Sequence, residues 1–146
     1  MSYSARELLA RIIKCEAGGE GDNGMRAVAT VIMNRVNAST GEYQRVGQGD
    51  LRQIIYQTGQ FDCVRDVVGG RPNMQTIYNS NPEPIHYEIA DWALGGGLLN
   101  AAGTSLWYFN PYGECREYFP PNRSGAFHTR INLHCFYRPT ELYHQT

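Results

Sequence analysis

An apolar stripe that ends in a carboxylate constrains this chain more than any other feature of its sequence. Ser4 and Glu7 stand three residues apart, which is the spacing of a capping box at the start of a helix. The apolar residues that follow recur at helical spacing: Leu8, Leu9, Ile12 and Ile13. The pattern predicts a first helix over Ala5–Ala17, ended by Gly18 and Gly19.

Glu16 continues this stripe, because it lies four residues after Ile12 and three after Ile13. Its carboxylate is therefore expected to face the protein interior. The helix macrodipole disfavours a negative charge at this end of the helix, and an apolar environment disfavours ionisation, so both effects raise the pKa of the carboxyl. A general acid needs such a pKa. The alternative is that Glu16 is the buried ion-pair partner of an arginine, such as Arg11 or Arg35.

The rest of the pattern predicts an α+β fold that is mainly helical. Three further stretches carry helical signals, at residues 23–37, 51–56 and 85–94. A short glycine loop joins the first two helices into a hairpin, and turn-rich loops are expected at residues 38–49, 69–72 and 79–84. A small β element is predicted in the last third from an aromatic run at 106–109 and from the alternation of Ile131, Leu133, Cys135 and Tyr137.

The composition suits one globular domain over residues 1–146 and excludes several classes of protein. A content of 42% hydrophobic and 18% charged residues is enough for one core. Thirteen Lys and Arg against 14 Asp and Glu leave a formal net charge of -1, which argues against nucleic-acid binding. No apolar run approaches the roughly 20 residues of a membrane span. The first residues lack a secretory signal pattern, so we expect synthesis in the cytoplasm.

The cysteines and histidines show no metal-site spacing. The four cysteines, Cys15, Cys63, Cys115 and Cys135, contain no Cys-x-x-Cys pair and are interpreted as buried small apolar residues, and any disulfide among them must join distant segments. The four histidines, His86, His128, His134 and His144, contain no His-Glu-x-x-His pair. His134 is interpreted as a structural histidine bonded to the backbone. We therefore predict neither a metal nor a cofactor.

Glu16 suits the cleavage of glycosidic bonds, which needs a proton donor. Hydrolysis also uses a second carboxylate about 5 to 9.5 Å away. The candidates for it are Glu20, Asp62 and Asp66, each interpreted first as a surface or loop-capping group, so a mechanism with one carboxylate stays open. Sugar sites offer flat rings and amides, and the plausible lining residues are Tyr56, Trp107, Tyr108, Asn110, Tyr112 and Tyr118.

Five separated motifs resemble those of a known family. They are LARIIKCEAGGEG at 9–21, VIMNRV at 31–36, IYQ and QF at 55–57 and 60–61, LWYFNPYGEC at 106–115, and HCFYRPT at 134–140. In this order they resemble the spore cortex-lytic cell-wall hydrolases of the SleB and CwlJ group, and the last two motifs resemble its CwlJ branch. The resemblance spans nearly the whole chain.

The resemblance implies a catalytic domain related in fold to lytic transglycosylases and goose-type lysozymes. The implied substrate is spore cortex peptidoglycan, degraded during germination. The family's essential glutamate maps onto Glu16, and the substrate contacts we predict are Gln60, Tyr108 and Asn110. Glu16 would protonate the glycosidic oxygen and then, as the conjugate base, assist attack by the C6 hydroxyl of the muramic acid, which leaves a 1,6-anhydro end.

The resemblance also implies where the protein acts and which other functions compete. A CwlJ-like chain without a signal peptide is expected to reach the spore coat and cortex from the mother-cell cytoplasm, with a small coat protein as docking partner. Cys115 and Cys135 fall inside CwlJ-like motifs and are expected to pair in an oxidising coat, whereas Cys15 and Cys63 replace small or apolar residues. The alternatives are an N-acetylmuramoyl-L-alanine amidase, which would normally need zinc, and a non-catalytic cortex-binding coat protein.

Overall fold

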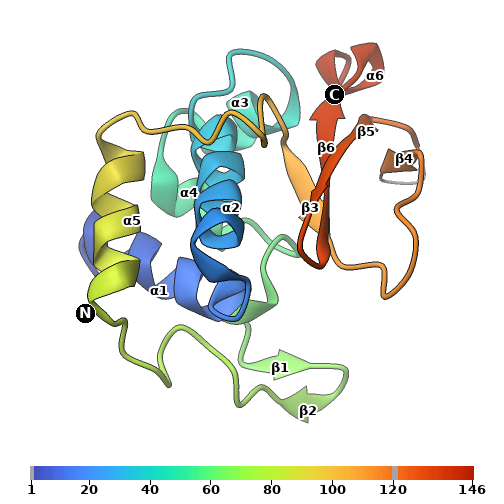
Figure 1. Cartoon of the computed structure of the whole chain (residues 1–146). Helices are drawn as coiled ribbons and strands as arrows, with labels where there is room; N and C mark the ends of the chain where they lie inside the picture. Colours follow the sequence, from blue (N-terminus) through green and yellow to red (C-terminus); the bar gives the residue numbers. More distant parts are fainter. Residues whose placement is uncertain (1, 120–121) are drawn as a thin grey trace.

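Helices and a small antiparallel sheet lie side by side in the computed structural model, which describes residues 2–119 and 122–146 (Figure 1). The helices are α1 (Ala5–Ala17), α2 (Gly21–Val36), α3 (Gly41–Gly47), α4 (Leu51–Tyr56), α5 (Pro84–Leu94) and α6 (Glu141–His144), with a 3-10 turn, η1, at Asp62–Val64. The strands are β1 (Val67–Val68), β2 (Arg71–Pro72), β3 (Trp107–Phe109), β4 (Tyr118–Phe119), β5 (Gly125–Ile131) and β6 (His134–Pro139). The predicted α+β, mainly helical fold is confirmed. None of the described helices combines the length and apolarity needed to cross a membrane.

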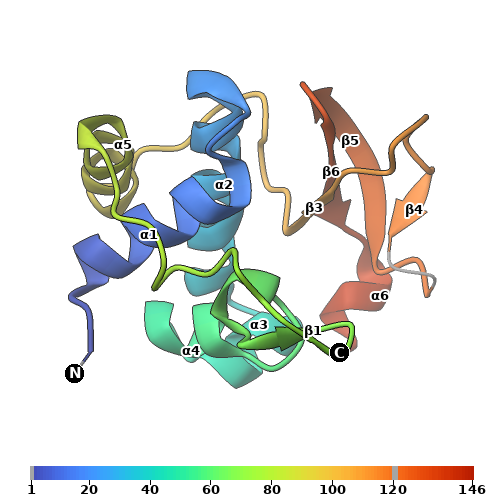
Figure 2. The ribbon, with the colours of Figure 1, turned by 90° about the horizontal axis from the view of Figure 1, so that it is seen from below.

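Helix α1 has the bounds that its sequence predicts. The Ser4 hydroxyl accepts a hydrogen bond from the Glu7 amide at 3.1 Å. The Glu7 carboxylate accepts instead from Arg11 and from the Tyr87 hydroxyl on α5, so only half of the capping box forms. The apolar stripe is fully buried and α1 packs on α2 and α5, as Figure 2 shows from below.

Helix α3 was not predicted from the sequence, since only a turn-rich connection was expected at 38–49. The helix is short and begins and ends with glycine, so its local signal is weak. Tyr43 holds it in place, because its buried ring lies 6.0 Å from that of Tyr143 and 6.2 Å from that of Trp107. Contacts about 60 and 100 residues away along the chain therefore stabilise α3.

The four-stranded sheet has the order β3-β6-β5-β4, and all of its pairs are antiparallel. Tyr108 of β3 lies opposite Phe136 of β6, which fixes the side of the sheet from which each ring projects. The predicted alternation over residues 131–137 does not belong to one strand. It crosses the β5–β6 hairpin, where Asn132 has a positive φ of 53° and Leu133 is exposed. The loop predicted at 69–72 covers the turn of the β1–β2 hairpin and its second strand, β2.

All four cysteines are in disulfides, which corrects their interpretation as separate buried residues. Cys115 pairs with Cys135, as the family resemblance implies, and joins the segment after β3 to β6. Cys15 pairs with Cys63 and joins the last turn of α1 to η1 across 48 residues. No sequence signal predicted the second pairing.

Gly41 and Gly49 test how strongly α3 depends on Tyr143. Both have a positive φ, of 75° and 78°, but a Cβ atom on Gly41 would meet the Tyr143 ring and carbonyl oxygen, whereas one on Gly49 would meet nothing. We expect Gly49→Ala to lower the free energy of unfolding by about 1 kcal/mol and Gly41→Ala by about 3 kcal/mol, because only the latter also displaces Tyr143. Urea denaturation measures both, and equal losses would contradict the contact.

Candidate active site

Glu16 lies in the last turn of α1 and points into the molecule, as its spacing predicts. Its Oε1 accepts a hydrogen bond of 2.5 Å from the hydroxyl of Tyr108 on β3. Its Oε2 lies 2.8 Å from the Sγ of Cys63 on η1. This sulfur belongs to a disulfide and carries no hydrogen, so the second contact is not a hydrogen bond. One carboxyl group on α1 therefore contacts two elements, β3 and η1, that are far from it in sequence.

The surroundings of Glu16 raise the pKa of its carboxyl above the ordinary value. Burial is the largest cause, and the nearby charge of Asp62 acts in the same direction. The hydrogen bond from Tyr108 and the positive charge of Arg35 oppose it by stabilising the ionised form. Burial also raises the pKa of Tyr108 well above its ordinary value, so this hydroxyl stays protonated and donates. The upward shift predicted for Glu16 is thus confirmed in direction.

The alternative role of Glu16, as the ion-pair partner of an arginine, is wrong. Arg11 pairs with Glu7 at 2.8 Å and donates to the Ile77 carbonyl. The buried Arg35 donates from Nε to the Leu106 carbonyl at 2.7 Å and from Nη1 to Gln60 at 3.4 Å, and its guanidinium lies over the Tyr43 ring. Within the described part of the chain, no arginine or lysine is within ion-pair distance of Glu16.

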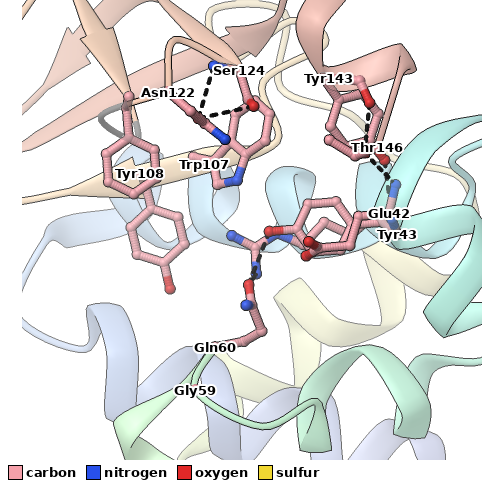
Figure 3. A pocket seen from close by; sticks show the side chains of 12 residues that line it. Glu42, Tyr43, Gly59, Gln60, Trp107, Tyr108, Asn122, Ser124, Tyr143 and Thr146 are labelled. Carbon is pink, nitrogen blue, oxygen red and sulfur yellow. Dashed lines mark hydrogen bonds between the residues drawn. The ribbon is translucent and has the colours of Figure 1, made fainter.

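A cavity of about 310 Å³ is lined by Tyr108, the hydrogen-bond donor to Glu16, whereas Glu16 itself is not among the lining residues. Its lining comes from the helical part, the sheet and the C-terminal segment: Arg35, Glu42, Tyr43, Gly59, Gln60, Trp107, Tyr108, Phe119, Asn122, Ser124, Tyr143 and Thr146. Figure 3 shows Tyr108 reaching from the sheet and Gln60 standing on the opposite wall. Aromatic rings, amides and one buried cation make this cavity suitable for a sugar chain with amide substituents.

The three predicted contacts are only partly brought together. Gln60 and Tyr108 both line the cavity, and Gln60 also accepts from the Tyr43 hydroxyl at 2.9 Å. Asn110 is not among the lining residues, and its Oδ1 accepts from the Tyr112 amide within its own turn. A role for Asn110 in binding substrate stays a prediction. The cavity also uses Glu42, Asn122, Ser124 and Thr146, which no local pattern singles out.

Of the three candidate second carboxylates, only Glu20 is well shielded. Asp62 and Asp66 are exposed, as expected for surface groups, and Asp62 pairs with Arg65. Glu20 accepts from the Leu133 amide at 3.1 Å, and its carboxylate lies 3.0 Å from the ring nitrogen of His134. The His134 ring lies edge-on to Tyr108 at 5.2 Å. Glu20 thus contacts His134, whose ring packs against Tyr108, the residue whose hydroxyl donates to Glu16.

Two histidines have structural partners in the described residues, and the partner of His134 differs from the one expected. His134 lies against the Glu20 carboxylate, not against a backbone group, which corrects the sequence interpretation. His86 accepts from the Glu83 amide at the start of α5. Across residues 2–119 and 122–146, no three His, Cys, Asp or Glu side chains gather in a way that could hold a metal ion.

Comparison with known proteins finds relatives that cover most of this chain. The family model described as Cell Wall Hydrolase matches residues 19–137, a range that begins just after Glu16. The Cell wall hydrolase CwlJ of Bacillus subtilis (strain 168) is 32% identical over 92% of this chain and 84% of its own length, and that of Oceanobacillus iheyensis is 30% identical over 92% and 86%.

Two solved structures share the fold. The catalytic domain of the germination-specific lytic transglycosylase SleB from Bacillus anthracis aligns with a TM-score of 0.64 at 23% identity, over 94% of this chain and 97% of that one. The catalytic domain of Bacillus cereus SleB aligns with a TM-score of 0.63 at 26% identity, over 94% and 93%. The predicted resemblance to the SleB and CwlJ group is confirmed.

Replacement of Tyr108 by Phe tests how far its hydrogen bond lowers the pKa of Glu16. We expect Tyr108→Phe to raise the pKa of Glu16 further, because the lost hydrogen bond stabilises the ionised carboxylate. Titration of carbon-13-labelled glutamate side chains by NMR measures the shift. Tyr56→Phe is the control, since Tyr56 is exposed and its hydroxyl contacts Tyr78 instead of Glu16. An unchanged or lower pKa in Tyr108→Phe would contradict the assignment.

Proposed function

This chain belongs to the Cell Wall Hydrolase family, and we propose that it cleaves the glycan strand of peptidoglycan with Glu16 as general acid and base. The observation that carries the proposal is a carboxyl group of raised pKa whose hydrogen-bond donor, Tyr108, lines a cavity of the right chemistry for a sugar chain. Degradation of the cell wall follows from the family. The bond cleaved and the role of Glu16 are our inference.

The proposed reaction needs one carboxyl group. Protonated Glu16 donates its proton to the glycosidic oxygen as the bond from C1 of the muramic acid breaks, and the leaving sugar departs as an alcohol. The Glu16 carboxylate then takes the proton of the C6 hydroxyl on the same muramic acid, while that oxygen bonds to C1. The product carries a 1,6-anhydro ring, and Glu16 is protonated again.

The neighbours of Glu16 suit both halves of this cycle. Burial raises the pKa of the carboxyl, which favours the protonated form that the first step needs. After the proton leaves, the Tyr108 hydroxyl and the charge of Arg35 stabilise the carboxylate. Because Tyr108 holds Oε1 by a hydrogen bond, we propose that Oε2 carries the transferred proton.

We propose spore cortex peptidoglycan as the substrate. The support is the family membership together with the fold neighbour that is described as germination-specific. Gln60 and Tyr108 are proposed substrate contacts because both line the cavity. We further propose that residues 1–146 form a single catalytic domain that acts in the coat and cortex region.

Replacement of Glu16 tests the reaction. We expect Glu16→Gln to lower the rate of fragment release from purified decoated-spore cortex by at least roughly a thousandfold, because the amide cannot donate the required proton. Glu88→Gln, exposed on α5, is the control and should keep full activity. Mass spectrometry of the fragments should find anhydro-muramic ends from the wild type only.

The products separate the alternatives. Reducing ends that depend on Glu16 would mean hydrolysis with a second carboxylate, for which Glu20 is the shielded candidate. Free stem peptides would identify an amidase and overturn glycan cleavage. Undiminished activity of Glu16→Gln would remove Glu16 from the mechanism, and binding without any release would indicate a non-catalytic protein.

Gln60 tests the proposed binding site. We expect Gln60→Ala to raise KM about fivefold with a smaller change in kcat, because a binding contact made equally in ground and transition states affects KM alone. Gln53→Ala on the exposed face of α4 should change neither value. Steady-state release of soluble muropeptides measures both constants, and an unchanged KM would place the sugar elsewhere.

A further inference from the structure

The disulfide between Cys15 and Cys63 lies against the proposed catalytic carboxyl. Cys15 directly precedes Glu16 in the last turn of α1, and the Sγ of Cys63 lies 2.8 Å from Glu16 Oε2. Oε2 is the oxygen that Tyr108 does not hold. In the described part of the chain this disulfide is the only side-chain cross-link between α1 and η1, and its Cys63 sulfur contacts the proposed reacting oxygen.

The oxidation state of Cys15 and Cys63 determines whether a disulfide sulfur or a thiol lies next to Glu16 Oε2. In the disulfide, the Cys63 sulfur carries no hydrogen and cannot donate. After reduction, a thiol at the same place carries a hydrogen that can bond to Oε2, and such a bond stabilises the ionised carboxylate. Loss of the cross-link also frees α1 from η1. Both changes work against Glu16 as a positioned general acid.

The other titratable and charged groups around Glu16 do not cancel this effect. They are the neutral Tyr108 on β3, the cation Arg35 on α2 and the carboxylate Asp62 on η1. Tyr108 and Arg35 lie on elements that the disulfide does not join, so reduction leaves them in place. Asp62 precedes Cys63, and its charge raises the pKa of Glu16, so any movement of η1 away from α1 lowers that pKa. The thiol and Asp62 act in the same direction.

A reductant can reach the pair from the surface. Cys15 lines a cavity of about 310 Å³ together with Arg11, Lys14 and Gln75, on the outer side of α1. The ammonium of Lys14, which donates to the Asn81 carbonyl, attracts a thiolate to this cavity, whereas the charge of Arg11 is compensated by Glu7. Cys63 is only 5% exposed, so the Cys15 sulfur is the one open to attack. Attack there expels the Cys63 sulfur towards Glu16.

We propose that Cys15 and Cys63 are a redox-responsive positioning pair, and that their reduction by a dithiol switches the enzyme to low activity. The proposal rests on the proposed function of Glu16. One dithiol thiolate attacks the Cys15 sulfur, and the Cys63 sulfur leaves and takes up a proton. The second dithiol sulfur then displaces the Cys15 thiolate, which is protonated in turn. The protein disulfide gains two electrons and two protons, and the dithiol becomes a cyclic disulfide.

The test compares three proteins before and after treatment with dithiothreitol: the wild type, Cys15→Ala/Cys63→Ala, and Cys115→Ala/Cys135→Ala. The last is the matched control, because it removes the disulfide that does not touch Glu16. Alkylation followed by mass spectrometry reports which cysteines are reduced. We expect reduction to lower kcat of the wild type and of the control variant by at least about tenfold. Cys15→Ala/Cys63→Ala should be slow from the start and should not respond.

The pH profile separates positioning from folding. Reduction should move the basic limb of the wild-type profile to lower pH, because a thiol that donates to Oε2 lowers the pKa of Glu16. Cys15→Ala/Cys63→Ser, which places a hydroxyl donor beside Oε2, should show the same move. Reoxidation of the wild type should restore rate and profile, which tests the proposal even if a double variant fails to fold.

Other outcomes overturn the proposal. One is an unchanged rate when alkylation shows that Cys15 and Cys63 are fully reduced. A second is a slower rate with an unchanged pH profile. A third is a loss of wild-type activity that correlates with reduction of Cys115 and Cys135 instead. Glu16→Gln distinguishes the two proposals. If Glu16→Gln is inactive and reduction does not change the rate of the wild type, only the redox proposal fails. If Glu16→Gln is active, the proposed function itself is rejected.

Discussion

The hydrogen bond from Tyr108 to Glu16 joins the last turn of α1 to the first strand of the sheet, and the geometry of the site depends on it. The position of Tyr108 follows from the pairing of β3 with β6, which also brings His134 edge-on to its ring. Glu20, at the turn between α1 and α2, accepts from the β5–β6 turn and lies against His134. The two parts of the molecule are thus aligned by polar contacts around two carboxyl groups, those of Glu16 and Glu20.

Local sequence pattern is sufficient to predict those parts of the fold that depend on contacts between residues close together in sequence. The bounds of α1, the burial of its stripe and the inward direction of Glu16 all follow from a period of 3.6 residues and one cap. The upward shift of the Glu16 pKa follows from the same pattern, because burial is its largest cause. Gln60 and Tyr108 were found through the family motifs and the chemistry of sugar sites, and both line the cavity.

Contacts between distant segments account for what the sequence could not predict. Helix α3 depends on Tyr143, about 100 residues away, and the Cys15–Cys63 pairing depends on how η1 folds back onto α1. The β5–β6 turn was hidden because Leu133 keeps the apolar alternation while standing exposed in the turn. Thr146 enters the cavity wall only because α6 packs beside α3.

The position of Arg35 explains why a buried cation near Glu16 does not cancel the upward shift of the Glu16 pKa. A direct ion pair would hold the carboxyl ionised and remove it as a proton donor. The guanidinium is instead held by the Leu106 carbonyl and by Gln60, and it packs on the rings of Tyr43 and Phe61. Its charge reaches Glu16 only through space, so it opposes the effect of burial without exceeding it. The same charge becomes more valuable once Glu16 has given up its proton, because the carboxylate then forms in a poorly solvated place. The position of one arginine thereby allows a single carboxyl to serve first as acid and then as base.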